Sequence, residues 1–340
     1  MDSLKKPIHP LWVNFKYYLF RGVSWLSARI PRRASYLVAN LVGDFIYFTW
    51  KRHSANAVSN MRRVLGPEAS WQTVKRAARQ SFRNYAMTIV DFLRFPHLDK
   101  LDVSKAVPIR EGIHHLFEAR ERGKGVLVIT GHIGNWDMAG AVFLSYGLPL
   151  SAISETHEPQ KMDELVNGTR EKAGMRIIRL DTSSLRQIFT ALKHNEGVTI
   201  LFDKPEDPSD GVPVQFFGET AYVPGGPGAI ALKTRAAIVV GYCVRRPGKR
   251  TFAGIVEPPI EYEPLLTGEK ERDIQIITQA IVSKMEDVIR QYPNQWYMFR
   301  EMWPRTESHD AEVKQKRFWG GKLDVNVELV NGQTGQLLPH

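Results

Sequence analysis

The stretch GVLVITGHIGNWDMAGAVFLS, residues 125–145, contains an apolar run, a glycine-bearing loop and a second apolar run. Residues 126–130 carry no charge and are mostly β-branched, which predicts a short buried strand. The residues that follow the loop predict a helix, with Asn135 as its N-cap and Gly147 beyond its end. A buried strand that leads through a short loop into a helix is the building unit of an α/β fold.

Strands and helices alternate along most of the chain after residue 120. Short apolar runs predict further strands at residues 148–155, 175–180, 197–203, 237–244 and 251–258. Runs with helical spacing predict helices at residues 159–174, 183–197, 227–236 and 272–292. This alternation indicates an α/β fold with a largely parallel sheet and helices on both faces. Residues 1–120 have mainly helical patterns, and Ser70 is the expected N-cap of a helix that extends to residue 95.

The net charge of +10 is concentrated near the N-terminus. Residues 1–80 hold 14 Lys and Arg against 3 Asp and Glu, whereas the remaining 260 residues hold 32 basic and 33 acidic groups. Aromatic and aliphatic residues are interleaved with the basic ones between Leu11 and Leu26. Basic side chains attract anionic lipid headgroups, and Trp and Tyr rings favour the depth of those headgroups. This composition favours a helix that lies on a membrane surface.

The longest apolar stretch, residues 34–50, is interrupted by Asn40, Gly43 and Asp44. It is shorter than the roughly 20 apolar residues that a spanning helix needs, so we expect this region to lie on a membrane rather than to cross it. A nucleic-acid interface is disfavoured by the many Leu, Val and Ile residues among the charges. The remaining alternative is that the apolar residues of this stretch pack on the protein core, namely Val38, Leu41, Phe45 and Tyr47.

These patterns divide the chain into three parts that form one unit. Residues 1–100 are a helical, basic, membrane-associating region, residues 101–304 are the α/β core, and residues 305–340 are a polar tail. The single cysteine, Cys243, excludes an intrachain disulfide and lies in an apolar run that indicates a core position. The first 15 residues lack the apolar segment and cleavage site of a secretory signal.

His132 and Asp137 lie where an open α/β sheet binds its ligands, just past the carboxyl end of a strand. In a regular helix, five residues would turn the two side chains about 140° apart. They can meet only if His132 precedes the helix and Asp137 lies in its first turn, with Gly131 and Gly134 allowing the bend. Asp137 would then hold one imidazole nitrogen and leave the other as a base. Asp203 ends another predicted strand and reaches the same edge.

Other common catalytic patterns are absent from the sequence. There is no Gly-x-Ser-x-Gly elbow, Walker loop or Gly-x-Gly-x-x-Gly sequence. We expect no bound metal, because His114 and His115 have no partner motif with metal-ligand spacing. A base without a nucleophile or metal fits the activation of a hydroxyl group that attacks an activated carbonyl. A thioester suits this reaction, because its leaving thiol has a pKa of about 8.5 and needs little protonation.

The segment GHIGNWD resembles the His-x4-Asp motif of the lysophospholipid acyltransferase superfamily. Within it, the chain is most similar to the branch of the bacterial lipid A late (lauroyl/myristoyl) acyltransferases and the phosphatidylinositol mannoside acyltransferases. The resemblance covers residues 52–304. Three further blocks match in the same order: VNGTREKAGMRII, LFDKPEDPSDGVPVQFFGETAYVPGGPGAIALKTRAAIV and YPNQWYMFREMWP.

The resemblance implies a glycerolipid-acyltransferase-like fold and an O-acyltransferase. Such an enzyme moves a fatty acyl chain from an acyl-CoA or acyl carrier protein thioester to a hydroxyl of a membrane glycolipid, at the cytoplasmic face of the cell membrane. We expect these thioesters to act as co-substrates, with no cofactor besides them, and a peripheral protein bound to anionic lipids, with no nucleic-acid partner. An acyl thioesterase or phospholipase that uses water, and a non-catalytic peripheral membrane module, are the alternatives.

The resemblance also implies roles for individual residues. His132 matches the general base, Asp137 its partner, and Glu219 a glutamate that supports the histidine or the acceptor. Arg170 matches an arginine that contacts anionic substrate groups. We add Asn135, Phe217 and Gly218 to the expected substrate-binding residues, with Phe216 and Phe217 along an acyl groove and the PGGPG turn as a candidate oxyanion donor. The lipid A enzymes usually carry Glu at the position of Asp137 and many begin with a spanning helix, so these departures favour the mannoside-type branch.

Overall fold

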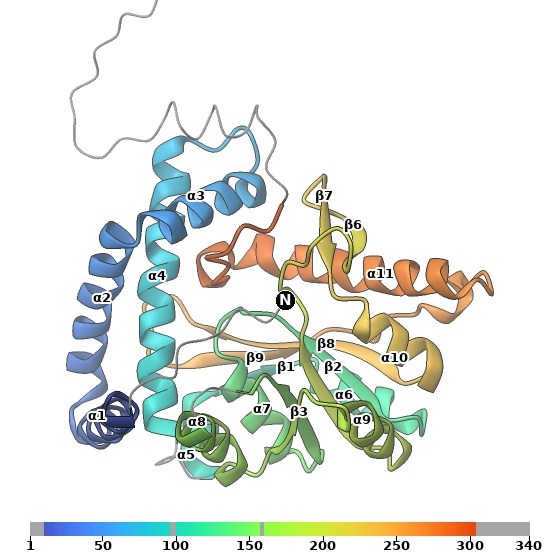
Figure 1. Cartoon of the computed structure of the whole chain (residues 1–340), viewed down its shortest axis with the longest axis horizontal. Coiled ribbons are helices and arrows are strands. Elements are labelled where there is room, and N and C mark those ends of the chain that lie inside the picture. The colour runs from blue at the N-terminus through green and yellow to red at the C-terminus, as the bar shows by residue number, and fades with distance from the viewer. Residues whose placement is uncertain (1–9, 96–99, 157–159, 304–340) are drawn as a thin grey trace, which may run out of the picture. The chain divides into compact units, whose positions relative to one another are not determined.

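The structure is a computed structural model that describes residues 10–95, 100–156 and 160–303 (Figure 1). The predicted tail at residues 305–340 lies outside the described residues. Four helices come first: α1 (Pro10–Arg29), α2 (Arg32–Thr49), α3 (Lys51–Leu65) and α4 (Trp71–Arg94). The side chain of Ser70 accepts a hydrogen bond from the Thr73 amide at 3.2 Å, which confirms it as the N-cap of α4. The helical character of the N-terminal region is therefore as predicted.

A seven-stranded sheet lies at the centre of the following part of the chain, in the order β1-β9-β8-β2-β5-β3-β4. All neighbouring strands are parallel except β8 and β9, which confirms a largely parallel sheet. The sheet strands are β1 (Ile109–Glu111), β2 (Val126–Thr130), β3 (Leu150–Ser154), β4 (Arg176–Arg179), β5 (Gly197–Leu201), β8 (Ala237–Arg245) and β9 (Phe252–Val256).

Apolar side chains on both faces of the sheet pack against helices. One face is covered by α5 (Lys100–Ala106), α6 (Ile113–Glu121) and α7 (Trp136–Ser145). The other is covered by α9 (Ser184–Lys193), α10 (Gly226–Thr234) and α11 (Lys270–Gln291). The strand β8 is buried along its whole length, as expected of a strand covered on both faces. Its Cys243 is fully buried, which confirms the predicted core position.

Three smaller elements complete the fold. Helix α8 (Gln160–Lys172) packs beside β4, and short 3-10 turns occupy Glu263–Leu265 and Pro293–Gln295. Strands β6 (Val212–Phe216) and β7 (Glu219–Val223) form an antiparallel hairpin that packs on α11. We did not predict this hairpin, and it contains the block FFGE.

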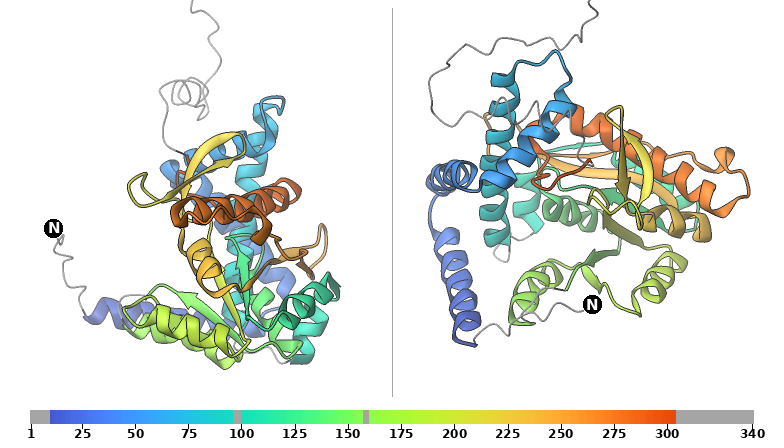
Figure 2. Two further views of the ribbon diagram at one scale, coloured as in Figure 1. Left: turned by 90° about the vertical axis from the view of Figure 1, so that its right-hand side faces the viewer. Right: turned by 45° about the horizontal axis from the view of Figure 1, so that its top comes forward.

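Helices α1 and α2 pack on the side of α4 that faces away from the sheet (Figures 1 and 2). Gly43 allows the close approach of α2 to α4, because a Cβ there would lie 2.7 Å from the Arg83 Cα. Asp44 accepts hydrogen bonds from Arg79 and Arg83 at 2.5–2.7 Å, and these bonds hold the pKa of its carboxyl far below the usual range. The charge inside the long apolar stretch is therefore paired with α4.

The outward faces of α1 and α2 carry exposed apolar side chains. The core-packing alternative placed four of these residues in the core, but only Tyr47 is buried. Val38, Leu41 and Phe45 are 59%, 70% and 68% exposed. Other large apolar residues on these two helices are also exposed: Phe15, Tyr18, Leu19, Val23, Trp25, Leu26, Leu37, Val42 and Phe48. Among the described residues, no helix has the length and apolarity needed to cross a bilayer.

Candidate active site

The loop that joins β2 to α7 forms one side of the candidate site. The side chain of Asn135 accepts a hydrogen bond from the Met138 amide at 2.9 Å and so caps α7, as the sequence predicts. The Asn135 amide donates to the carbonyl oxygen of Cys243 in β8 at 2.7 Å. Gly134 has a φ of +60°, and a Cβ there would lie 2.1 Å from the same carbonyl oxygen. Close approach to β8 therefore requires glycine at this bend.

The imidazole of His132 is held by Asp203. Its Nδ1 lies 2.8 Å from Oδ1 of Asp203, and the His132 backbone amide donates to both carboxylate oxygens at 2.9–3.0 Å. The side chain of Asp203 is 1% exposed, whereas that of His132 is 39% exposed. An ionised carboxylate only accepts hydrogen bonds, so Nδ1 carries the proton and Nε2 has the free lone pair of a base.

The strand register explains why these two residues meet. Strands β2 and β5 are parallel neighbours, and Thr130 is paired with Leu201 in their register. His132 and Asp203 each lie two residues beyond that pair, so both leave the sheet at the same edge. Gly131 leaves room for the contact, because a Cβ there would lie 2.8 Å from Oδ2 of Asp203.

Burial and charge act in opposite directions on the pKa of His132. Burial favours the neutral ring and lowers the pKa, but the negative charge of Asp203 and its hydrogen bond outweigh this effect, so the pKa of His132 is raised above 6.5. Burial likewise opposes ionisation of Asp203, yet the charge of His132 and the hydrogen bonds from His132 and Trp296 lower the pKa of its carboxyl below the usual value. The pair therefore combines an ionised carboxylate with a more basic imidazole.

Residues 295–297 bond both to the loop that carries His132 and to Asp203. The Gly134 amide donates to the carbonyl oxygen of Gln295 at 2.9 Å, and the Tyr297 amide donates to that of His132 at 2.8 Å. The indole Nε1 of Trp296 donates to Oδ2 of Asp203 at 2.9 Å. This segment belongs to the YPNQWYMFREMWP block, in which we predicted no site residue.

Asp137 has a different partner from the one we expected. Its Oδ1 accepts a hydrogen bond from Nε of Arg170 at 2.7 Å, and Arg170 also contacts Ser154 and Asn167. The prediction that Asp137 holds the imidazole of His132 is wrong in this structure, because Nδ1 is bonded to Asp203. Asp137 does lie in the first turn of α7, as predicted, but it meets α8 through Arg170.

The block FFGE forms the turn of the β6–β7 hairpin. Phe217 and Gly218 have φ values of +51° and +79°, as a two-residue type I′ turn requires. The carboxylate of Glu219 is 2.9 Å from Nε of Arg63 in α3 and is 45% exposed. Phe216 and Phe217 are buried, and both rings pack near Trp296 and Trp303. The structure thus gives this block a clear local role, and its contact with substrates stays a prediction.

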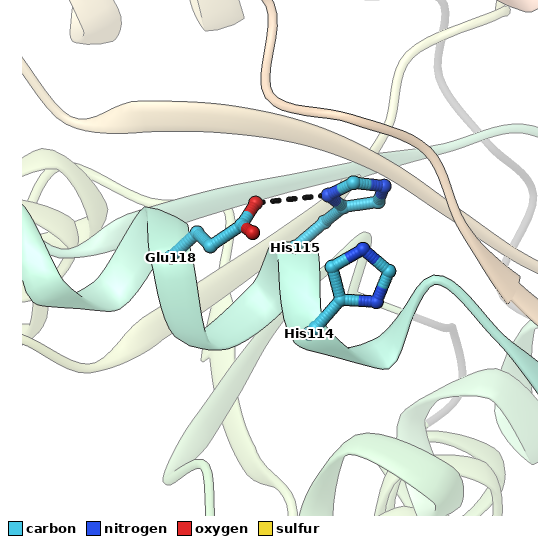
Figure 3. A group of neighbouring side chains, drawn as sticks. All are labelled: His114, His115 and Glu118. Atoms are coloured by element: carbon cyan, nitrogen blue, oxygen red, sulfur yellow. Dashed lines mark hydrogen bonds and ion pairs between the residues drawn. The ribbon is translucent and has the colours of Figure 1, made fainter.

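A separate group of side chains lies on α6. His114, His115 and Glu118 place their ligand atoms within 4.8 Å of one another, and Nδ1 of His115 is 2.9 Å from Oε2 of Glu118 (Figure 3). Glu118 was not predicted as a third group, although an i, i+3 spacing brings helix side chains together. These residues could hold a metal ion such as Zn²⁺ at the surface. The contacts described above for His132 involve none of them.

The geometry as a whole places a partly exposed imidazole, which can act as a base, at the carboxyl edge of the sheet. Asp203 fixes the His132 ring and stabilises its protonated form, as a carboxylate partner does for a general base. Sequence reasoning noticed Asp203 at the strand end but did not pair it with His132. The missing signal was the adjacency of β2 and β5, which are separated in the chain by β3 and β4.

The sequence of this chain matches a family model and several characterised proteins. The family model described as "Bacterial lipid A biosynthesis acyltransferase" matches residues 7–305. The chain is 28% identical over 248 residues to the phosphatidylinositol mannoside acyltransferase of Mycolicibacterium smegmatis, a match that covers 72% of this chain and 77% of that protein. It is 26% identical over 265 residues to the protein of the same name from Mycobacterium tuberculosis strain H37Rv, covering 76% and 80%.

A more distant relative carries the other branch name. The chain is 22% identical over 244 residues to the lipid A biosynthesis palmitoleoyltransferase of Escherichia coli, covering 72% of this chain and 78% of that protein. Relatives from both branches confirm the resemblance drawn from the four sequence blocks.

Proposed function

Because the chain belongs to the bacterial lipid A biosynthesis acyltransferase family and is therefore an acyltransferase, we propose that it acylates a hydroxyl group of a membrane glycolipid. The acyl donor is an acyl-CoA or acyl carrier protein thioester, and no other cofactor takes part. The acceptor is a glycolipid of phosphatidylinositol mannoside type or lipid A type, the two substrate classes named by the relatives. The single observation that supports this most directly is the His132–Asp203 pair at the edge of the sheet.

In this proposal His132 is the general base. Its Nε2 takes the proton of the acceptor hydroxyl while the oxygen attacks the thioester carbonyl carbon. Asp203 stabilises the imidazolium that forms, because its carboxylate is already bonded to Nδ1. The tetrahedral intermediate then collapses, the carbon–sulfur bond breaks, and the thiolate leaves as a thiol after taking the proton from His132. The products are the ester and the free thiol.

The ion pair between Asp137 and Arg170 supports the site from α7. We propose that it fixes the first turn of α7 against α8, and so fixes the loop that carries His132. Both side chains are largely buried, at 6% and 17% exposed. Arg170 has Nε committed to Asp137, so its expected contact with anionic substrate groups would use its other nitrogen atoms.

We further propose that α1 and α2 bind peripherally to the cytoplasmic face of the cell membrane. Their exposed apolar residues would enter the interface, while the exposed Arg21, Arg29 and Arg33 would meet anionic headgroups. Burying a large apolar side chain contributes about 1.5–3 kcal/mol. Phe45→Asp is therefore expected to lower the partition into anionic vesicles at least about tenfold in a sedimentation assay. Leu185→Asp, an exposed leucine on α9, is the matched control and should leave the partition unchanged.

The proposed reaction is tested by the release of free thiol from palmitoyl-CoA and palmitoyl carrier protein, with and without a total bacterial lipid extract. Release that requires the extract and is lost in His132→Ala would support acyl transfer, and mass spectrometry of the acylated lipid would identify the acceptor. Release at the same rate without any lipid would instead show a thioesterase that uses water. No release from either donor by the folded protein would contradict the proposed function.

A further inference from the structure

Trp296 is fully buried beside the His132–Asp203 pair and donates its only polar hydrogen to Asp203. Its side chain is 0% exposed, and Nε1 lies 2.9 Å from Oδ2 of Asp203. A buried indole N–H usually has a hydrogen-bond acceptor. Here the acceptor is the carboxylate of Asp203, which is bonded to His132. The indole can therefore act on His132 through Asp203.

The position of this indole is fixed by its own backbone neighbours. Ile133 and Trp296 form an antiparallel bridge, and the adjoining residues Gln295 and Tyr297 each bond to the loop that carries His132. The side chain of Gln295 also bonds to both the amide and the carbonyl oxygen of Arg245, at 2.7 and 2.9 Å. The indole is thus held in a constant position relative to both the loop and β8.

The carboxylate of Asp203 has two sets of donors. Oδ1 faces Nδ1 of His132, Oδ2 faces the indole of Trp296, and the backbone amide of His132 lies between them. A carboxylate can rotate about its Cβ–Cγ bond, so a donor on one oxygen controls the direction of the other. The indole thereby restrains the rotation that would move Oδ1 away from the imidazole.

We propose that Trp296 is a positioning residue for acyl transfer, whose indole N–H keeps the Asp203 carboxylate in the orientation that holds Nδ1 of His132. This inference rests on the proposed function, in which His132 is the base. Trp296 also packs against the rings of Phe216, Phe217 and Trp303. If packing were its only role, loss of the N–H would leave catalysis unchanged. The two roles therefore differ in the consequence of removing one hydrogen-bond donor.

The test is replacement of Trp296 by 3-benzothienylalanine, which keeps the size of the ring but has sulfur in place of N–H. Trp296→Phe is made beside it, and the matched control is 3-benzothienylalanine at Trp303, whose Nε1 donates to the carbonyl oxygen of Phe216 at 3.1 Å. The measurements are kcat and KM for thiol release, the pH dependence of kcat, and the pKa of His132 from NMR of its labelled ring. The NMR titration does not depend on any activity.

We expect kcat to fall roughly tenfold to hundredfold with KM nearly unchanged, because a misplaced base slows the chemical step. Rotation of the carboxylate away from Nδ1 weakens the charge interaction and the hydrogen bond that raise the pKa of His132, so this pKa should fall by up to about one unit. Arg300 lowers and Glu155 raises the pKa of His132, and both are unchanged in these variants. The Trp303 variant should keep the pKa and the kcat of the unmodified protein.

Each outcome supports or overturns the inference. An unchanged kcat and an unchanged pKa of His132 in a folded Trp296 variant would overturn it. Equal losses of kcat in the Trp296 and Trp303 variants, with no change in the pKa, would also overturn it and show that the cluster acts through packing. If the unmodified protein releases no thiol, the proposed function fails, whereas the NMR titration still reports whether the indole acts on the pair.

Discussion

Asp203 and Asp137 are both buried carboxylates near the same loop, but they hold different kinds of partner. Asp203 follows β5 and holds a partly exposed imidazole that can gain and lose a proton. Asp137 lies on α7 and holds the permanently charged guanidinium of Arg170. The first pair can take part in proton transfer, whereas the second cannot, because the guanidinium keeps its proton. The comparison shows that the partner of a carboxylate, more than its distance along the sequence from a histidine, determines its chemistry.

The largest effect should come from removing the base itself. His132→Ala is expected to lower kcat about 10³-fold or more, because a positioned general base contributes roughly 10²–10⁴-fold and Asp203 then loses its function as well. The measurement is thiol release with lipid acceptor present. The thermal midpoint is expected to fall as well, because the Asp203 carboxylate, at 1% exposed, loses the imidazole that it is paired with.

The control for this substitution is His114→Ala, an exposed histidine on α6 outside the site. It should retain full activity. Activity within a few fold of the unmodified protein in His132→Ala would remove the basis of the comparison, because neither carboxylate would then serve a base.

The next largest effect is expected from Asp203→Asn. The neutral amide can no longer stabilise the imidazolium, so kcat should fall about 10²-fold, measured at the pH optimum. Asp137→Asn is the matched variant, since it makes the same chemical change in the other pair. If both variants lose the same fraction of kcat, the two carboxylates would not differ in function, and the distinction drawn here would be wrong.

The pH dependence of kcat sharpens the same contrast. His132 must be neutral to act as a base, so the rate should fall as the pH drops through its raised pKa, which lies above 6.5. Asp203→Asn removes the charge that raises this pKa, so the acid limb should move to lower pH. Asp137→Asn should leave the limb in place. A limb that stays in place in Asp203→Asn would contradict the assignment of Asp203 as the partner of the base.

The smallest effect on turnover is expected from Asp137→Asn. It should lower kcat by less than about tenfold but lower the free energy of unfolding by about 1–3 kcal/mol, because Arg170 loses a charged partner in a mostly buried position. Chemical denaturation measures the second quantity. A stability equal to that of the unmodified protein would show that the ion pair does not fix α7 and α8.

Most of the fold could be predicted from local patterns. The strands β2 to β5 and the helices α7 to α11 follow runs whose periodicity lies within a single element, and Asn135 and Ser70 cap their helices as expected. The β6–β7 hairpin was missed because its turn is Phe217-Gly218, and a phenylalanine at positive φ is not a recognised turn signal. The ring of Phe217 packs near Trp296 and Trp303, which come from distant parts of the chain.

The site was only partly predictable, for a reason that lies in the sheet. His132 could be selected because its own loop and strand mark it. Its partner depends on which strands become neighbours, and β5 lies between β2 and β3 although it comes later in the chain. Spacing along the sequence favoured Asp137, but the register that pairs Thr130 with Leu201 selects Asp203. Trp296 comes from still farther along the chain, and no local pattern connects it to His132.

The bond between the Tyr297 amide and the His132 carbonyl also has a consequence during synthesis of the chain. Residue 297 follows residue 132 by 165 residues, so the ribosome adds it roughly 10–30 s later at ordinary elongation rates. Until then the loop that carries the histidine lacks one of its main restraints, even if the strands before it have already paired. A nascent chain would thus present α1 and α2, the helices that we propose bind lipid, long before it could carry out chemistry, so on this proposal arrival at the lipid surface can precede the onset of activity.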